Sequence, residues 1–135
     1  MGVIYQGECA HCGYSRQFHL GGGLGSLHWE RNVRTLHPEE RAELERLQQQ
    51  GAVATFEGAQ QLVACPCCPA DTALMERTCI TITGPHGEQT FGRLCPVCGA
   101  AVRVYGGGME EPPQNVPCPH CSDHLLGFRR VGFWD

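Results

Sequence analysis

The sequence contains no lysine, and all ten of its basic residues are arginine. Its 135 residues include 14 acidic side chains, so the formal net charge at pH 7 is -4. Contact with many phosphates requires clustered positive charge. A net negative chain that lacks lysine is therefore a poor candidate for a protein that covers nucleic acid with a broad basic surface.

Long apolar runs are also missing. No segment approaches the ~20 consecutive apolar residues of a membrane-spanning helix, so we expect no contact with a membrane. Residues 1–6 show neither a basic start nor an apolar run, so we expect no secretory signal and a cytoplasmic location. The chain also lacks the nucleophile-elbow, phosphate-loop and H-E-x-x-H motifs, which favours a protein that is not an enzyme.

What the sequence does have is cysteine, ten residues in a chain of modest size. Eight of them form four C-x-x-C pairs: Cys9/Cys12, Cys65/Cys68, Cys95/Cys98 and Cys118/Cys121. Glycine follows two of these pairs, and proline follows the first cysteine in three. Two residues between thiolates allow a tight turn that points both sulfurs at one ion, and a glycine after the turn tolerates positive φ. This pattern is typical of a zinc knuckle.

Two other roles for the cysteines are disfavoured. A disulfide framework is disfavoured because disulfides persist mainly in oxidising compartments, and we expect no export signal. A redox-active C-x-x-C would begin a helix after a strand, whereas these pairs repeat among strand-like segments. Two knuckles complete one closed site with four thiolates, so the four pairs predict two metal sites.

The spacing allows two ways of pairing the knuckles. Gaps of 52, 26 and 19 residues separate them in turn. Sequential pairing, which we favour, gives site 1 as Cys9, Cys12, Cys65 and Cys68, and site 2 as Cys95, Cys98, Cys118 and Cys121. In the alternative, the two central knuckles form one site inside an outer site made from the chain ends. The long gap does not exclude the first scheme, because the entropy of loop closure grows slowly with length.

Alternating apolar residues predict short strands around the knuckles, at 3–8, 14–20, 52–56, 61–64, 77–83, 90–94, 100–105 and 125–133. One helix is expected at about 39–50, with Pro38 at its start, acidic residues in its first turn and Gly51 at its end. Together with sequential pairing, this predicts two units: residues 1–75, a ribbon with a helical insertion, and residues 76–135, a hairpin with a second ribbon.

The knuckles resemble those of the zinc-ribbon and rubredoxin-like class. The best matches are Cys9-Ala10-His11-Cys12-Gly13-Tyr14 and Cys95-Pro96-Val97-Cys98-Gly99-Ala100, while the other two knuckles lack the trailing glycine. The resemblance covers the knuckles and their flanking strands but not the helix. It implies a small, metal-stabilised, mainly β fold with two ribbon units and one inserted helix, a scaffold used for binding protein or nucleic acid. It implies no single activity.

Four-thiolate sites hold zinc or iron. We expect two zinc ions, with iron as the alternative, because aromatic residues are only 7% of the chain and a rubredoxin iron site lies in a dense aromatic core. A closed site has no open position for a reactive water. Each structural zinc supplies roughly 10–16 kcal/mol of apparent folding free energy, which exceeds what small cores supply alone.

The other cysteines and the histidines are not expected to bind metal. Cys79 is expected to be a small buried hydrophobe and Cys67 an exposed spare thiol. Of the seven histidines, His11 and His120 lie at knuckle tips, and His124 follows Cys121 by three residues. Since eight well-spaced cysteines are available, we expect these imidazoles at the surface or beside the ligands.

The function that the sequence favours is a zinc-binding adaptor or accessory protein. It would present ribbon edges and aromatic anchors to a protein partner or larger complex, with Trp29 and the apolar segment 131–134 as candidate anchors. One alternative is a nucleic-acid-binding ribbon, and a second is a rubredoxin-like iron electron carrier. Eight thiolates bring eight negative charges and two zinc ions four positive ones, which takes the net charge from -4 to about -8 and disfavours nucleic acid.

Overall fold

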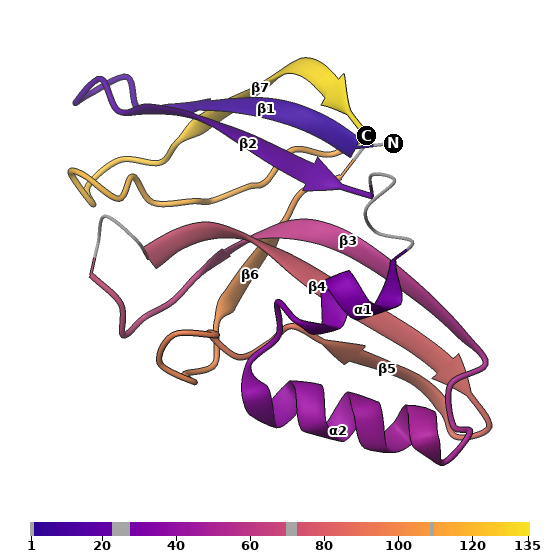
Figure 1. Ribbon diagram of the computed structural model, residues 1–135. Helices are drawn as coiled ribbons and strands as arrows, with labels where there is room; N and C mark the ends of the chain where they lie inside the picture. The colour runs from indigo at the N-terminus through magenta and orange to yellow at the C-terminus, as the bar shows by residue number, and fades with distance from the viewer. Residues whose placement is uncertain (1, 23–27, 70–72, 109) are drawn as a thin grey trace.

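The computed structural model describes residues 2–22, 28–69, 73–108 and 110–135. In these residues the chain forms seven strands and two helices (Figure 1). They follow one another as β1 (Gly2–Glu8), β2 (Ser15–Gly21), α1 (Trp29–Val33), α2 (Pro38–Gln49), β3 (Thr55–Ala64), β4 (Leu74–Gly84), β5 (Gly87–Phe91), β6 (Arg103–Gly106) and β7 (Gly127–Trp134). The prediction of a mainly β protein is confirmed.

The strands pair antiparallel in the order β5-β4-β3-β2-β1-β7, and β6 pairs with β3. The sheet is nearly divided in its middle, because β2 and β3 share the single pair Gly21 and Gln60. We call β1, β2 and β7 the terminal half of the sheet, and β3 to β6 the central half. In Figure 1 the terminal half lies above the central half, and α2 lies below it.

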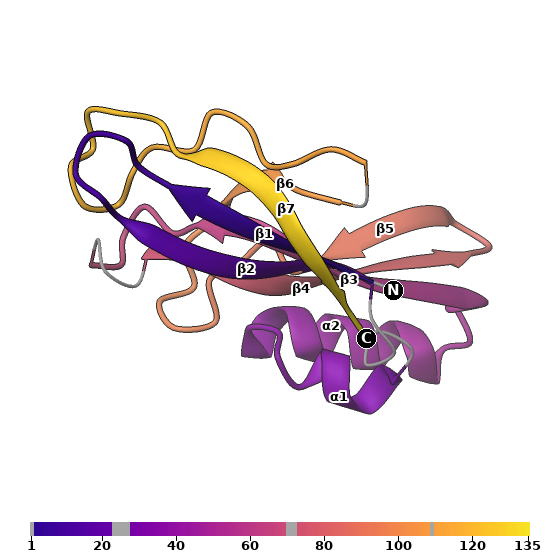
Figure 2. The ribbon, with the colours of Figure 1, turned by 90° about the horizontal axis from the view of Figure 1, so that it is seen from above.

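Two apolar cores cover one face of the long β3–β4 hairpin. Leu74, Ile80 and Ile82 share that face, because side chains alternate along a strand. Leu74 lies in a core with Phe18 and other residues of the terminal half. Ile80 and Ile82 lie in a second core with the helices, around Leu44 of α2, which is fully buried. The hairpin therefore joins both cores, and Figure 2 shows the helices beside it.

Helix α2 begins and ends as the sequence predicts. The Nδ1 atom of His37, its N-cap, accepts a hydrogen bond of 3.3 Å from the backbone N–H of Glu39, and Pro38 occupies the first turn. Gly51, with φ +71°, follows the helix at its end. No pattern in the sequence predicts α1, which has only five residues and no side-chain cap on its first turn.

Two further expectations differ from the structure. Segments 52–56 and 61–64 were expected as separate strands, but β3 continues from Thr55 to Ala64 because β4 pairs with it along its whole length. The expected boundary between residues 75 and 76 falls inside β4. In the described residues, no helix has the length and apolar character needed to cross a bilayer.

The chain ends lie side by side, because β1 and β7 pair from Gly2 opposite Trp134 to Glu8 opposite Gly127. The indole of Trp134 covers Gly2 and donates a hydrogen bond of 3.0 Å to the carbonyl of Leu20. A Cβ atom on Gly2 would lie 2.1 Å from the indole Nε1. Glycine at this position therefore allows the last strand to dock its tryptophan on the sheet.

Candidate metal centres

Three of the four C-x-x-C turns have closely similar backbone geometry. In the first, the N–H of Cys9 donates to the carbonyl of Tyr14 at 2.9 Å, and the N–H of Gly13 donates to the carbonyl of Cys9 at 3.0 Å. The turns at Cys95 and Cys118 repeat the second bond, with Gly99 and Ser122 as its donors. These three donor residues have positive φ: +78° at Gly13, +76° at Gly99 and +61° at Ser122.

The turn at Cys65 and Cys68 is built differently. Pro69 follows it, and proline has no N–H to donate and cannot adopt positive φ. The N–H of Cys65 instead donates to the carbonyl of Ala73 at 2.9 Å. The carbonyl that accepts the hydrogen bond from the first cysteine therefore lies farther along the chain in this knuckle than in the other three.

The structure brings the eight paired cysteines into two groups of four, in each of which all sulfurs lie within 4.8 Å of one another. The outer tetrad consists of Cys9, Cys12, Cys118 and Cys121. The inner tetrad consists of Cys65, Cys68, Cys95 and Cys98.

The sulfur separations fit a tetrahedral metal site. Between knuckles, the sulfurs of Cys9 and Cys121 are 3.7 Å apart, and those of Cys12 and Cys118 are 3.5 Å apart. A tetrahedron with metal–sulfur bonds of about 2.3 Å has edges of about 3.8 Å. A disulfide needs about 2.05 Å between sulfurs, and all ten cysteines are free thiols. The donor set and its spacing fit Zn²⁺ or another thiophilic ion.

The inner tetrad has the same arrangement. The sulfurs of Cys65 and Cys98 are 3.3 Å apart, and those of Cys68 and Cys95 are 3.7 Å apart. In both tetrads the first cysteine of each knuckle is buried, while the second is exposed or half-buried. Each site thus has one side against the protein and one side toward solvent.

The sequential pairing of knuckles is wrong, and the nested alternative describes the structure. Pairing of β1 with β7 carries the first and last knuckles to the same end of the terminal half, so Cys9 and Cys12 meet Cys118 and Cys121. The two central knuckles then form the inner tetrad. Each tetrad takes cysteines from both sides of the expected 75/76 boundary, so residues 1–75 and 76–135 do not each enclose a site of their own.

Backbone N–H groups favour the thiolate form at two buried cysteines, Cys9 and Cys95. The N–H groups of Cys12 and His11 donate to the Cys9 sulfur and lower the pKa of that thiol to about 6, although burial opposes them. At Cys95, burial raises the pKa, but the N–H groups of Cys98 and Val97 outweigh it and bring the pKa to about 7.

Other thiols in the tetrads resist ionisation. The N–H of Tyr14 lowers the pKa of Cys12, but burial and the neighbouring thiols raise it to about 12. Hydrogen bonding to Cys65, followed by burial, raises the pKa of Cys68 to about 12. Crowded sulfurs cannot all carry a negative charge unless a cation lies among them. Each tetrad is therefore chemically suited to a divalent metal ion.

A carboxylate that the sequence predicts only as an acidic residue of a first helical turn anchors the inner tetrad. Glu40 of α2 accepts three backbone hydrogen bonds, from Gly92 at 2.7 Å, Arg93 at 3.1 Å and Leu94 at 3.0 Å. These amides come directly before Cys95, so the helix fixes the approach to this knuckle. The only sequence signal was an acidic residue in a first helical turn, which is also typical of ordinary helices.

The spare cysteines lie as expected. Cys79 is buried, with its sulfur 3.9 Å from the carbonyl of Gly92, and burial raises the pKa of this thiol. Cys67 is exposed and belongs to neither tetrad.

Three histidines surround the outer tetrad without entering it. His124 Nδ1 lies 3.9 Å from the Cys121 sulfur, and the ring of His124 stacks on His11 with centroids 4.1 Å apart. His120 packs against Tyr14. All three imidazoles are exposed, as expected for histidines at the surface or beside the ligands.

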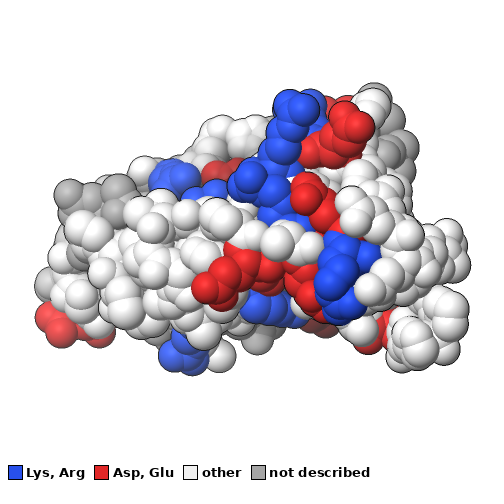
Figure 3. Space-filling model, turned by 60° about the horizontal axis from the view of Figure 1, so that its bottom comes forward, with Lys and Arg blue, Asp and Glu red and all other residues white. Residues whose placement is uncertain are grey.

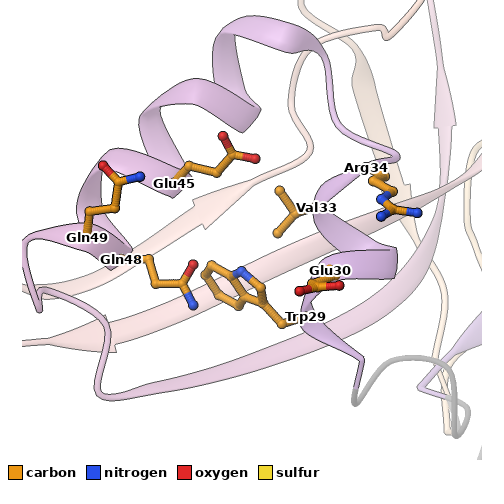
Figure 4. A pocket seen from close by; sticks show the side chains of 7 residues that line it. All are labelled: Trp29, Glu30, Val33, Arg34, Glu45, Gln48 and Gln49. Atoms are coloured by element: carbon orange, nitrogen blue, oxygen red, sulfur yellow. The ribbon is translucent and has the colours of Figure 1, made fainter.

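Apart from the tetrads, the structure has an open groove of about 380 Å³ between α1 and α2, lined by Trp29 among other residues (Figure 4). Trp29 also packs edge-on against Phe56. Both tryptophans therefore contact their own fold. On the face shown in Figure 3, acidic and basic side chains are mixed.

Comparison with protein-family models, with curated proteins and with solved structures found no match to this chain. The resemblance to zinc ribbons therefore rests on the knuckles themselves, whose two tetrads are compatible with ribbon-like metal sites.

Proposed function

We propose that this protein is a two-zinc adaptor, in which both tetrads hold structural Zn²⁺ and the sheet presents a binding surface to a protein partner. The observation that carries the proposal is the pair of four-sulfur clusters with tetrahedral spacing. Four thiolates leave no open coordination position, so the metal would stabilise the fold and take no direct part in a reaction.

The partner surface is proposed at the outer edge of the sheet. Phe133 on β7 is 55% exposed, whereas both tryptophans are half-buried. An exposed aromatic side chain on an outer strand is the kind of group that anchors protein interfaces.

The metal part is tested by purifying the chain without chelators and measuring its metal by native mass spectrometry and elemental analysis. We expect two zinc ions per chain. Iron in their place would support the electron-carrier alternative and remove the zinc assignment. A strong chelator is expected to unfold the protein, because about 10–16 kcal/mol of apparent folding free energy is lost with each ion. A circular dichroism spectrum that stays unchanged after metal removal would contradict a structural role.

The partner part is tested by co-purification from the source cell. Phe133→Asp should reduce recovery of a specific protein, because it places a charge in the proposed interface. Val97→Asp is the matched control, since Val97 is also an exposed apolar residue, 79% exposed, and lies on the inner knuckle instead of β7. Equal recovery with both variants would remove Phe133 as an anchor.

A further inference from the structure

The outermost strand on the terminal side, β7, has one edge without a strand partner among the described residues. It pairs with β1 on its other edge, from residue 127 to residue 134. Backbone N–H and C=O groups along an open edge can pair with an added strand. The edge is interrupted once, by a β-bulge at Val131, where the register with β1 shifts.

One face of β7 carries an arginine between two aromatic side chains, and the other face carries a second arginine. The register with β1 places Phe128, Arg130 and Phe133 on the face that looks toward the core, and Arg129 on the opposite face. Arg129 and Arg130 are both exposed and adjacent in sequence, so each face of the edge carries one arginine. The guanidinium of Arg130 lies 5.7 Å from the Phe133 ring centroid.

Apolar surface lies on both sides of this positive centre. Phe133 and Val131 are 55% and 40% exposed at one end. At the other end, a groove of about 500 Å³ runs beside the strand and is lined in part by Phe128 and Leu125, the latter 56% exposed. On this edge Arg129 also forms an ion pair with Glu8 of β1, at 3.5 Å.

We propose that β7 is extended by a strand from a partner protein, in which two adjacent acidic residues are flanked by apolar residues. The inference rests on the proposed adaptor function and names the chemistry of its partner. In an antiparallel addition that keeps the bulge, residues opposite Phe133, Arg130 and Phe128 share a face, and the residue opposite Arg129 lies on the other. The matching partner pattern is apolar, any residue, acidic, acidic, apolar.

Charge disfavours a second copy of the chain as the occupant. Two β7 strands side by side would bring four arginines to one seam, and like charges across a strand pair are destabilising. An acidic strand would instead place a carboxylate beside each guanidinium, where bidentate hydrogen bonds can form.

The experiment uses the zinc-loaded full chain and two fluorescent heptapeptides, TVTEEVT and TVTKKVT, with binding followed by fluorescence anisotropy. We expect the acidic peptide to bind at least tenfold more tightly than the basic one. In the double variant Arg129→Glu/Arg130→Glu this preference should reverse. Arg46→Glu on α2 removes an arginine away from the edge and should leave both affinities unchanged. Native mass spectrometry of each variant confirms that two zinc ions are retained.

Equal affinities for the two peptides, or a preference unchanged by charge reversal, would overturn the proposal. A dimer that the double variant dissociates would assign the edge to a second copy, and displacement of the peptide by single-stranded DNA would assign it to nucleic acid. If a cellular partner is recovered equally with the wild type and the double variant, the adaptor function stands and this edge does not. Failure to find zinc would instead remove the adaptor proposal, while the peptide result is read independently.

Discussion

The outer and inner tetrads contain the same four ligand atoms but hold very different lengths of chain. The inner tetrad joins knuckles 26 residues apart, whereas the outer tetrad joins knuckles with 105 residues between Cys12 and Cys118. Because loop-closure entropy grows with the logarithm of length, this difference amounts to only about 1 kcal/mol. Chain entropy therefore places no strong limit on which knuckles meet, and the strand pairing decides it.

The surroundings of the two tetrads differ more than their closure costs. Cys9 and Cys118 of the outer tetrad are part of the apolar core of the terminal half, next to Phe18 and Leu20. The inner tetrad has one knuckle of irregular shape and is tied to α2 through Glu40. Packing thus supports the outer site, and hydrogen bonds donated to a helix side chain support the inner one.

Substituting two cysteine ligands at once tests which knuckles share a metal site. These variants should also have the largest effect on stability, because they lose bound metal. Cys12→Ser/Cys118→Ser removes two ligands from the outer tetrad alone, so the variant should retain one zinc ion. Cys12→Ser/Cys68→Ser removes one ligand from each tetrad and should lose both ions. Native mass spectrometry reads the count directly. The reverse result would restore the sequential pairing.

Removal of the Glu40 carboxylate should weaken the inner tetrad without changing its ligands. Glu40→Ala leaves three backbone N–H groups without their acceptor, which is expected to cost about 2 kcal/mol in the free energy of unfolding. Urea unfolding measures the change, and hydrogen exchange should accelerate at residues 92–94. The neighbouring Glu39→Ala is the control and should change stability by less than about 0.5 kcal/mol. Equal effects of the two variants would show that Glu40 acts only as a first-turn acid.

The smallest effect is expected at the two residues of positive φ that follow the knuckles of the outer tetrad. Ser122 adopts φ +61°, where glycine is favoured, and its counterpart Gly13 has φ +78° with no heavy atom within 4 Å of an added Cβ. Ser122→Gly should therefore stabilise the protein by about 0.5–1 kcal/mol, and Gly13→Ser should destabilise it by about the same amount. Thermal unfolding of the zinc-loaded variants measures both. Changes of the same sign would mean that side-chain contacts outweigh backbone conformation here.

The sequence was sufficient to predict the knuckles, because their geometry is local. Two residues between cysteines and a glycine such as Gly13 or Gly99 determine the turn by themselves. Strands near the knuckles and helix α2 were predicted for the same reason, from alternation and from the signals at Pro38 and Gly51. The roles of Cys67 and Cys79 also followed from the surplus of better-spaced ligands.

The pairing could not be predicted, because it depends on β1 meeting β7, which no local pattern encodes. The middle of β3 is polar and contains Gly58, yet pairing with β4 keeps it extended. Helix α1 is too short to show a periodic pattern, and its core residue Val33 belongs to a cluster whose other members include residues of α2 and of strands distant in sequence. Glu40 gained its role from hydrogen bonds to residues more than 50 positions away.

The nested order of the knuckles has a consequence for synthesis on the ribosome. The inner tetrad has all four ligands once residue 98 has emerged, whereas the outer tetrad waits for residue 121. Domains and their parts generally fold as they emerge, from the N-terminal side first. Until the last knuckle appears, Cys9 and Cys12 have only half of their tetrad, so the outer tetrad is completed after the inner one.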